Sequence, residues 1–223
     1  NNIAAIVFYE NKNNFIGGGD RNYVAGDFSS VVGGQNNTLN GTNNVIGGGS
    51  NNQITREANT YPLPVDSLGV ASNSVIAGGS ENTILFATDA VIGGGSLNIA
   101  SSVGAVIAGG ANNKAKGEHS TISGGRYNIA SNKGGAVGGG VNNQATGEHS
   151  TVAGGGGDGY LDAQGVFNHA NLGNIASGAS SSVGGGQQNK ALGTKSTIAG
   201  GSDNYVYLGN SVIGGGTNNM VGS

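Results

Sequence analysis

The side chains best suited to contact a ligand gather in two stretches of the sequence, 55–72 and 157–182. The second stretch combines aromatic rings, an acid and an imidazole within ten positions. Binding residues are often carried by loops that are mounted on a rigid scaffold. The alternative is a surface loop or a disguised structural repeat that covers its own small hydrophobic cluster. The residues expected to bind a ligand are Tyr61, Asp66, Tyr160, Asp162, Phe167 and His169.

Catalytic chemistry finds little support in the sequence. A catalytic site needs a nucleophile beside a base, or paired acids in a concave pocket. The 3 His and the 12 acidic residues are scattered and form no such pattern. The chain has no Cys, which excludes disulfides and Cys-ligated metal sites. We therefore expect a protein that is not an enzyme and that has no cofactor.

Metal binding is also not expected. His119 and His149 belong to two copies of the segment GEHST, which would lie two coils apart at about 10 Å, too far to share one ion. In register, Glu118, Lys133 and Glu148 would instead form an exposed ladder of alternating charge. The segment GGGGDGYLD at 154–162 faintly resembles a calcium-binding nonapeptide, but it occurs once and with the wrong spacing.

The scaffold for these residues is a short repeat. Its kernel is an Ile or Val, one small residue, a Gly-Gly pair, two variable residues and an Asn, and the usual step between Asn residues is 15 positions. A fixed short period is the signature of a stacked repeat architecture. The kernels span Ile16 to Asn22, Val31 to Asn37, Ile46 to Asn52, Ile76 to Asn82, Ile92 to Asn98, Ile107 to Asn113, Ile122 to Asn128, Val137 to Asn143, Val152 to Asp158, Val183 to Asn189, Ile198 to Asn204 and Ile213 to Asn219.

Each repeat offers two positions for a hydrophobic core. One is the kernel Ile or Val, and the other is a small or apolar residue two positions after the Asn, as at Leu39 and Ile54. This spacing predicts a coil of two short β-strands and two turns. Gly permits positive φ and close backbone approach. The Asn tolerates left-handed conformations, and its amide can bond the turn backbone or stack in a ladder.

The repeat pattern predicts a single repeat domain at 15–223, preceded by an opening strand or cap at 1–14. The spacings of 30 residues from Asn52 to Asn82 and of 31 from Asp158 to Asn189 are close to two periods, which suggests about 14 coils. The irregular stretches 55–72 and 157–182 are thus either loops or degenerate coils. Pro62 and Pro64 favour a loop in the first, because proline cannot donate to a strand ladder.

Composition limits the partners of the chain. There are 47 Gly, 9% charged residues and a net charge of −3 with no basic run, which disfavours nucleic acid and anionic membrane as partners. No segment approaches the length of an apolar membrane span. The small apolar contribution of each repeat builds a core only when the repeats stack.

The kernels resemble the head repeats of trimeric autotransporter adhesins, the YadA-like left-handed parallel β-roll. The similarity rests on SVIGGGTNNMVG (211–222), VIAGGANNKAKGEHSTISGGRYNIAS (106–131) and VGGGVNNQATGEHSTVAGG (137–155) and covers about four-fifths of the chain. An extra Gly and Asn recur here, and the period is 15 where 14 is also common in that family. Similar repeats occur in bacteriophage tail fibres. The resemblance implies a homotrimer with a shared hydrophobic seam.

We expect an extracellular fibre segment, on a bacterial surface or a virion tail fibre, that binds a host-cell surface protein or a glycan receptor. The structural repeat residues Ile16, Asn22, Ile46, Asn52, Ile107, Asn113, Ile213 and Asn219 would form the scaffold. One alternative is a purely structural spacer or self-assembling filament subunit. Another is a glycan-processing fibre enzyme, for which Asp66, Asp158, Asp162 and Glu118 would be the visible acids.

Overall fold

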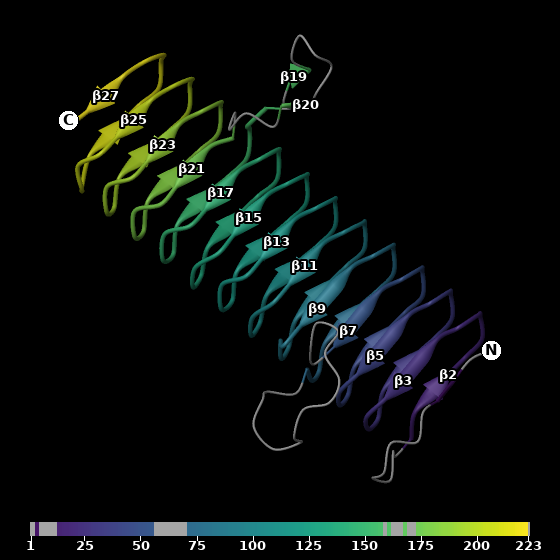
Figure 1. Cartoon of the computed structure of the whole chain (residues 1–223). Coiled ribbons are helices and arrows are strands. Elements are labelled where there is room, and N and C mark those ends of the chain that lie inside the picture. Colours follow the sequence, from purple (N-terminus) through teal and green to yellow (C-terminus); the bar gives the residue numbers. More distant parts are fainter. Residues whose placement is uncertain are drawn as a thin grey trace. The chain divides into compact units, whose positions relative to one another are not determined.

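The chain folds as a parallel β-solenoid of about 12 turns with about 15 residues per coil. The computed structural model describes residues 3–4, 13–55, 71–157, 160–161, 167–168 and 173–222. Contacts divide the chain into two compact units, Asn1–Asn112 and Asn113–Ser223. Within each unit, successive coils lie side by side, and each coil adds one strand to each of two parallel sheets (Figure 1). The predicted all-β repeat fold is confirmed.

In the first unit, sheet A and sheet B each contain six strands in parallel pairing. Strand β1 pairs with β3 and opens sheet A. Sheet A consists of β1 (Ile3–Ala4), β3 (Tyr23–Ala25), β5 (Thr38–Asn40), β7 (Gln53–Thr55), β9 (Thr83–Leu85) and β11 (Ile99–Ala100). Sheet B consists of β2 (Phe15–Ile16), β4 (Ser30–Val31), β6 (Val45–Ile46), β8 (Val75–Ile76), β10 (Val91–Ile92) and β12 (Val106–Ile107).

The second unit repeats this arrangement. Its sheet A consists of β13 (Lys114–Ala115), β15 (Ile129–Ala130), β17 (Gln144–Ala145), β21 (Ile175–Ala176), β23 (Lys190–Ala191), β25 (Tyr205–Val206) and β27 (Met220–Val221). Its sheet B consists of β14 (Thr121–Ile122), β16 (Ala136–Val137), β18 (Thr151–Val152), β22 (Ser182–Val183), β24 (Thr197–Ile198) and β26 (Val212–Ile213). Strands β19 (Tyr160–Leu161) and β20 (Phe167–Asn168) form a separate antiparallel pair.

The core is the pair of inward columns that the repeat predicts. In each two-residue strand one side chain points inward and its neighbour points outward, since side chains alternate across a strand. Ile46 and Ile54 are fully buried, and so are Ile107 and Ala115 at the equivalent positions of a later coil. Burying one Ile or Val contributes about 1.5–3 kcal/mol, and the Ala positions contribute less. Of the repeat residues at the ends of the array, Ile16 is half-buried and Ile213 is buried.

The kernel Asn residues form a continuous hydrogen-bonded ladder in each unit. Asn52 is typical: its Nδ2 donates to the carbonyl oxygen of Gly48 in its own coil at 3.0 Å and to that of Gly79 in the next coil at 2.9 Å. Its Oδ1 accepts from the backbone N–H and Nδ2 of Asn82. Asn22 belongs to the ladder of the first unit, and Asn113 and Asn219 belong to the ladder of the second, with Asn219 exposed. The predicted amide ladder is confirmed.

The left-handed conformation belongs to the residue before the ladder Asn, and not to the ladder Asn itself. Arg21, Asn51, Glu81 and Leu97 have φ between 54° and 57°. An L-residue reaches this region at a cost unless it is Gly, Asn or Asp, so the cost at Glu81 and Leu97 is offset by the ladder that the turn completes. The left-handed backbone conformation and the hydrogen-bonding amide are therefore supplied by two adjacent residues, and not by one Asn.

A glycine is required where two coils approach at the kernel turn. Gly79 has φ +90°, and a Cβ there would overlap the carbonyl oxygen of Gly95 in the next coil. It would also press against Nδ2 of Asn82 at 2.7 Å. The preceding Gly78 has open space at its Cβ position and no positive φ. At this turn Gly79 must be glycine, whereas position 78 has room for a side chain.

The number of coils is smaller than predicted, because each long gap contains one coil and an insertion. Thr55 pairs with Leu85 and Val45 with Val75, so residues 56–70 interrupt a single coil. The second gap is closed by Asn174, whose Nδ2 donates to the carbonyl oxygen of Gly154 at 2.9 Å and whose N–H donates to Oδ1 of Asn143. Asn174, and not Asp158, is therefore the ladder residue; Asp158 lies outside the described residues.

The boundaries of the irregular stretches change accordingly. Residues 173–182 belong to regular coil, because Ala145 pairs with Ala176 and Val152 pairs with Val183. Residues 71 and 72 are also in register, since Ser72 forms a bridge with Thr42. A third irregularity is a single extra residue, Phe86, with φ 53° and an exposed ring. It accounts for the one 16-residue step.

Candidate functional site

Each insertion begins or ends next to a strand of sheet A. Residues 56–70 begin directly after β7, at the carboxyl end of a sheet A strand. The second insertion falls between Gly156, which still forms a bridge with Val141, and Asn174, which directly precedes β21. The sheet B strands continue without interruption in the same coils. Any ligand-binding surface built by the insertions would therefore adjoin the outward face of sheet A.

The predicted ligand-binding residues all lie in the insertions. Tyr61, Asp66, Asp162 and His169 lie outside the described residues. Tyr160 and Phe167 lie on the antiparallel strands β19 and β20, in which Tyr160 is opposite Asn168 and Leu161 is opposite Phe167. The pairing brings these two aromatic positions to neighbouring rungs of the hairpin. The assignment of these six residues to a ligand stays a prediction.

The outward face of sheet B in the first unit is apolar and carries no charge. Its outward residues Val45, Val75, Val91 and Val106 are direct neighbours in the parallel register. Phe15 is 55% exposed and Val32, just after β4, is 54% exposed. The positions after each strand are otherwise small, as at Gly47 and Ala77, which leaves the valine column uncovered. Contiguous exposed apolar surface of this kind marks an interaction site.

The same face in the second unit is uncharged but more polar. Its outward column runs Thr121, Ala136, Thr151, Ser182, Thr197 and Val212. The residues after these strands are Ser123, Gly138, Ala153, Gly184, Ala199 and Gly214. Only small residues stand beside the column, so this is also a flat surface on which another backbone can approach closely. Sequence reasoning found the inward columns but not these outward ones.

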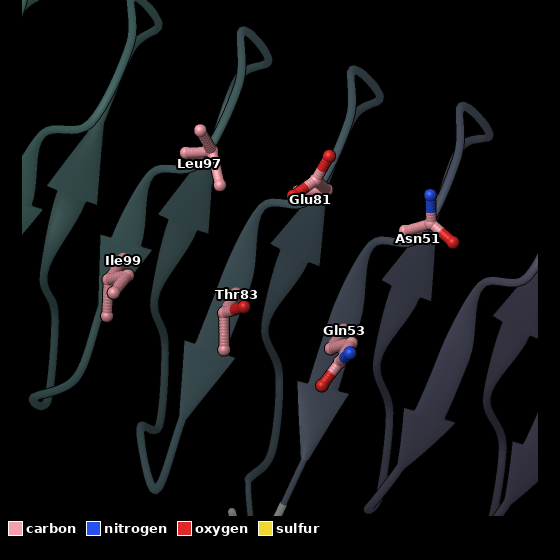
Figure 2. Close-up of a pocket in the computed structure, with 6 residues that line it drawn as sticks. All are labelled: Asn51, Gln53, Glu81, Thr83, Leu97 and Ile99. Carbon is pink, nitrogen blue, oxygen red and sulfur yellow. The ribbon is translucent and has the colours of Figure 1, made fainter.

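A shallow groove crosses the outward side of sheet A in the first unit. It has a volume of about 500 Å³ and is open to solvent along its length. Figure 2 shows three rows of two side chains on successive coils, polar at one end and apolar at the other. The lining residues are Asn51, Gln53, Glu81, Thr83, Leu97 and Ile99. Glu81 is the only ionisable group among the six, so the groove offers no acid–base pair.

The charged turn edge is formed in part as predicted. Lys133 Nζ lies 3.5 Å from Glu118 Oε1, one coil away. Glu148 instead has its Oε1 3.6 Å from Nε2 of its neighbour His149. These side chains are about half exposed, so water screens the pairs and their contribution to stability is small. His119 Nε2 likewise lies 3.5 Å from Glu118 Oε1, so the acid–base–acid ladder is replaced by one inter-coil pair and two local pairs.

Comparison with known proteins assigns no family. No protein-family model matches the chain, and no curated protein sequence matches it. Among the described residues no helix is long and apolar enough to cross a membrane. Within the same residues, no group of three or more His, Asp, Glu or Cys side chains is placed to hold a metal ion.

Proposed function

We propose that this chain is a segment of a non-enzymatic, trimeric surface fibre that binds a host-cell protein or glycan receptor. The YadA-like resemblance of the kernels suggests a left-handed roll and a homotrimer on a bacterial surface or a virion. The observation that carries the proposal is the distribution of polar surface: sheet B is flat and uncharged, while both insertions adjoin sheet A. This division suits a solenoid that hides one face and presents the other.

Sheet B is the face we assign to the seam between subunits. Obligate interfaces resemble a domain core and exclude charged residues from their centre. The described outward residues of sheet B contain no charged side chain in either unit. Val91 is 37% exposed, so covering it between subunits would add about a third of the value for a fully exposed valine, about 0.5–1 kcal/mol per side chain.

A charge on this face is expected to prevent assembly. In a trimer, Val91→Lys would place three lysines at the seam, where each buried charge lacks a partner. Gln53→Lys introduces the same side chain at an exposed outward position of sheet A in the same unit. Sedimentation equilibrium should give a trimer for the parent chain and for Q53K and a monomer for V91K. A trimer for V91K would show that sheet B is not the seam.

Receptor binding is expected to depend on the insertions. Joining Gly156 to Gly173 removes 157–172 and restores the 15-residue step from Asn143 to Asn174, and Gly173 already lies against the Asn142 carbonyl of the preceding coil. Joining Thr55 to Ala71 does the same for 56–70. Both variants should stay folded, with a thermal midpoint within about 5 °C of the parent chain. Binding of the fluorescently labelled chain to cultured epithelial cells should fall at least about tenfold in one of them.

Treating the cells with glycosidases or with proteases beforehand distinguishes a glycan receptor from a protein receptor. Undiminished cell binding by both folded deletion variants would remove the receptor site from the insertions. If the parent chain binds no cells but forms end-to-end filaments in electron micrographs, the structural alternative of a spacer or filament subunit is favoured instead.

A further inference from the structure

The outward face of sheet A in the second unit carries charge of one sign only. We name it the lysine–tyrosine face, after its charged and its large aromatic residues. It carries three lysines and no carboxylate, although the whole chain has a net charge of −3. The equivalent strand positions in the first unit carry no lysine. The face consists of Lys114, Lys116, Ile129, Ser131, Gln144, Thr146, Ile175, Ser177, Lys190, Leu192, Tyr205 and Tyr207.

An aromatic platform lies at one end of this face. The rings of Tyr205 and Tyr207 have centroids 6.3 Å apart and planes within 15° of parallel. Tyr207 is 45% exposed and Tyr205 is half-buried. Lys190, on the neighbouring strand, places Nζ 5.2 Å from the centroid of the Tyr205 ring. Two nearly parallel rings beside a cation form a flat surface with one polar flank.

Among the described residues, no acid neutralises the lysines of this face. The described carboxylates of the second unit lie at turns: Glu118 pairs with Lys133, Glu148 faces His149, and Asp203 accepts a hydrogen bond from the Ser202 hydroxyl at 2.7 Å. Within the described part of the chain, no carboxylate lies within salt-bridge distance of Lys114, Lys116 or Lys190. The face therefore keeps a positive potential towards solvent.

We propose that the lysine–tyrosine face binds a linear acidic polysaccharide. The apolar C–H side of a pyranose ring would stack on Tyr205 and Tyr207, whose π-faces carry partial negative charge. Carboxylate or sulfate groups of the polymer would pair with Lys190, Lys114 and Lys116. Between these ends, Gln144, Ser131 and neighbouring polar side chains offer hydrogen bonds to sugar hydroxyls.

The repeat suits a polymer better than a compact ligand. Parallel strands β13, β15, β17, β21, β23 and β25 lie about 4.8 Å apart and present their outward residues in straight columns. A chain of linked sugar rings running across these strands would meet new contacts at each coil. The residues of this face lie neither in the insertions nor in sheet B, so the substitutions that test it leave the proposed receptor residues and the proposed trimer seam unchanged.

The test measures binding of the full chain to heparin (sulfated), polygalacturonate (carboxylated) and dextran (neutral) by isothermal titration calorimetry at several salt concentrations. We expect both acidic polymers to bind and dextran not to bind. The Y205A/Y207A variant should bind at least about tenfold more weakly, and Y205F/Y207F should retain binding because Phe still stacks. K190Q should weaken binding about three- to tenfold, and the loss should shrink at high salt.

Lys195 provides the matched control. It lies on a turn of the same unit, so K195Q makes the same change in net charge away from the face. We expect K195Q to bind within about twofold of the parent chain. Equal losses for K195Q and K190Q, equal binding of dextran, or equally tight binding of single-stranded DNA would each overturn the proposal, as would failure of both acidic polymers to bind. Circular dichroism melting establishes that the tyrosine variants are folded.

Discussion

Replacing Asn128 by Ala is expected to lower the free energy of unfolding by about 2–4 kcal/mol, because one buried N–H loses its acceptor and two carbonyl groups each lose a hydrogen bond. Its Nδ2 donates to the carbonyl oxygens of Gly124 at 3.0 Å and Gly140 at 2.9 Å. Its Oδ1 accepts the N–H of Asn143 at 2.9 Å. Alanine leaves the buried N–H of Asn143 without its acceptor and removes one bond from each of the Gly124 and Gly140 carbonyl oxygens, of which Gly140 keeps a bond from the N–H of Arg126. Guanidinium unfolding measures the change.

Asn132 is the matched control for this prediction. It lies on an exposed turn in the same unit, where its Nδ2 donates to the carbonyl oxygen of Thr146 at 3.0 Å. Water can replace that bond, so Asn132→Ala should cost less than about 1 kcal/mol. If the two variants unfold at the same denaturant concentration, the ladder does not hold the coils together.

Replacing Gly79 by Ala is expected to destabilise the chain by about 3 kcal/mol or more, since left-handed strain and overlap act at one residue. The added methyl group would overlap the carbonyl oxygen of Gly95 and press on the amide of Asn82, and both partners are held in the ladder. Relief would require the two coils to separate. The thermal midpoint should fall sharply, and the chain should become sensitive to proteases.

The same substitution at Gly78, one residue earlier, is the matched control. Its Cβ position is open and its φ is not positive. Gly78→Ala should therefore be neutral or should stabilise the chain by about 0.4–1 kcal/mol, through reduced freedom of the unfolded state. Equal destabilisation at both positions would mean that the turn, and not the close approach of coils, determines the cost.

The sequence predicts the inward half of this fold well, because the core of a repeat is periodic. Ile46 and Ile54 were placed inward by their spacing, and both are fully buried. The sequence pattern gives Asn52 both tolerance of a left-handed turn and an amide that can bond in a ladder, whereas the structure assigns the first role to Asn51 and the second to Asn52. Spacing alone could not separate two adjacent residues of the same type.

Dividing the two long gaps by the repeat length gives the wrong number of coils. A gap of 30 or 31 residues has the same length whether it contains two coils or one coil with an insertion. Asn174 has no Gly-Gly pair of its own directly before it, because Gly154 and Gly155 supply the turn from the other side of the insertion. The segment Asn174-Ile175-Ala176 was a usable signal, since it repeats the pattern of Asn128-Ile129-Ala130.

The outward faces could not be predicted in this way, because their residues vary between coils. The valine column of sheet B and the tyrosine pair Tyr205 and Tyr207 become visible only when the strand register is known. For the insertions, sequence alone identifies their recognition-type side chains, and the structure adds where the chain leaves and rejoins the stack.

The departures from the 15-residue repeat have a consequence for how identical chains align. In a strictly periodic stack, one chain shifted by a whole coil against its neighbour would make nearly the same contacts, so many alignments would have similar energies. Phe86 and the insertions at 56–70 and 157–172 occur at fixed and unequal intervals. A shift by one coil would bring unlike features together at each of them. These irregular residues therefore select a single alignment of the subunits in the proposed trimer, a task that the regular coils cannot perform.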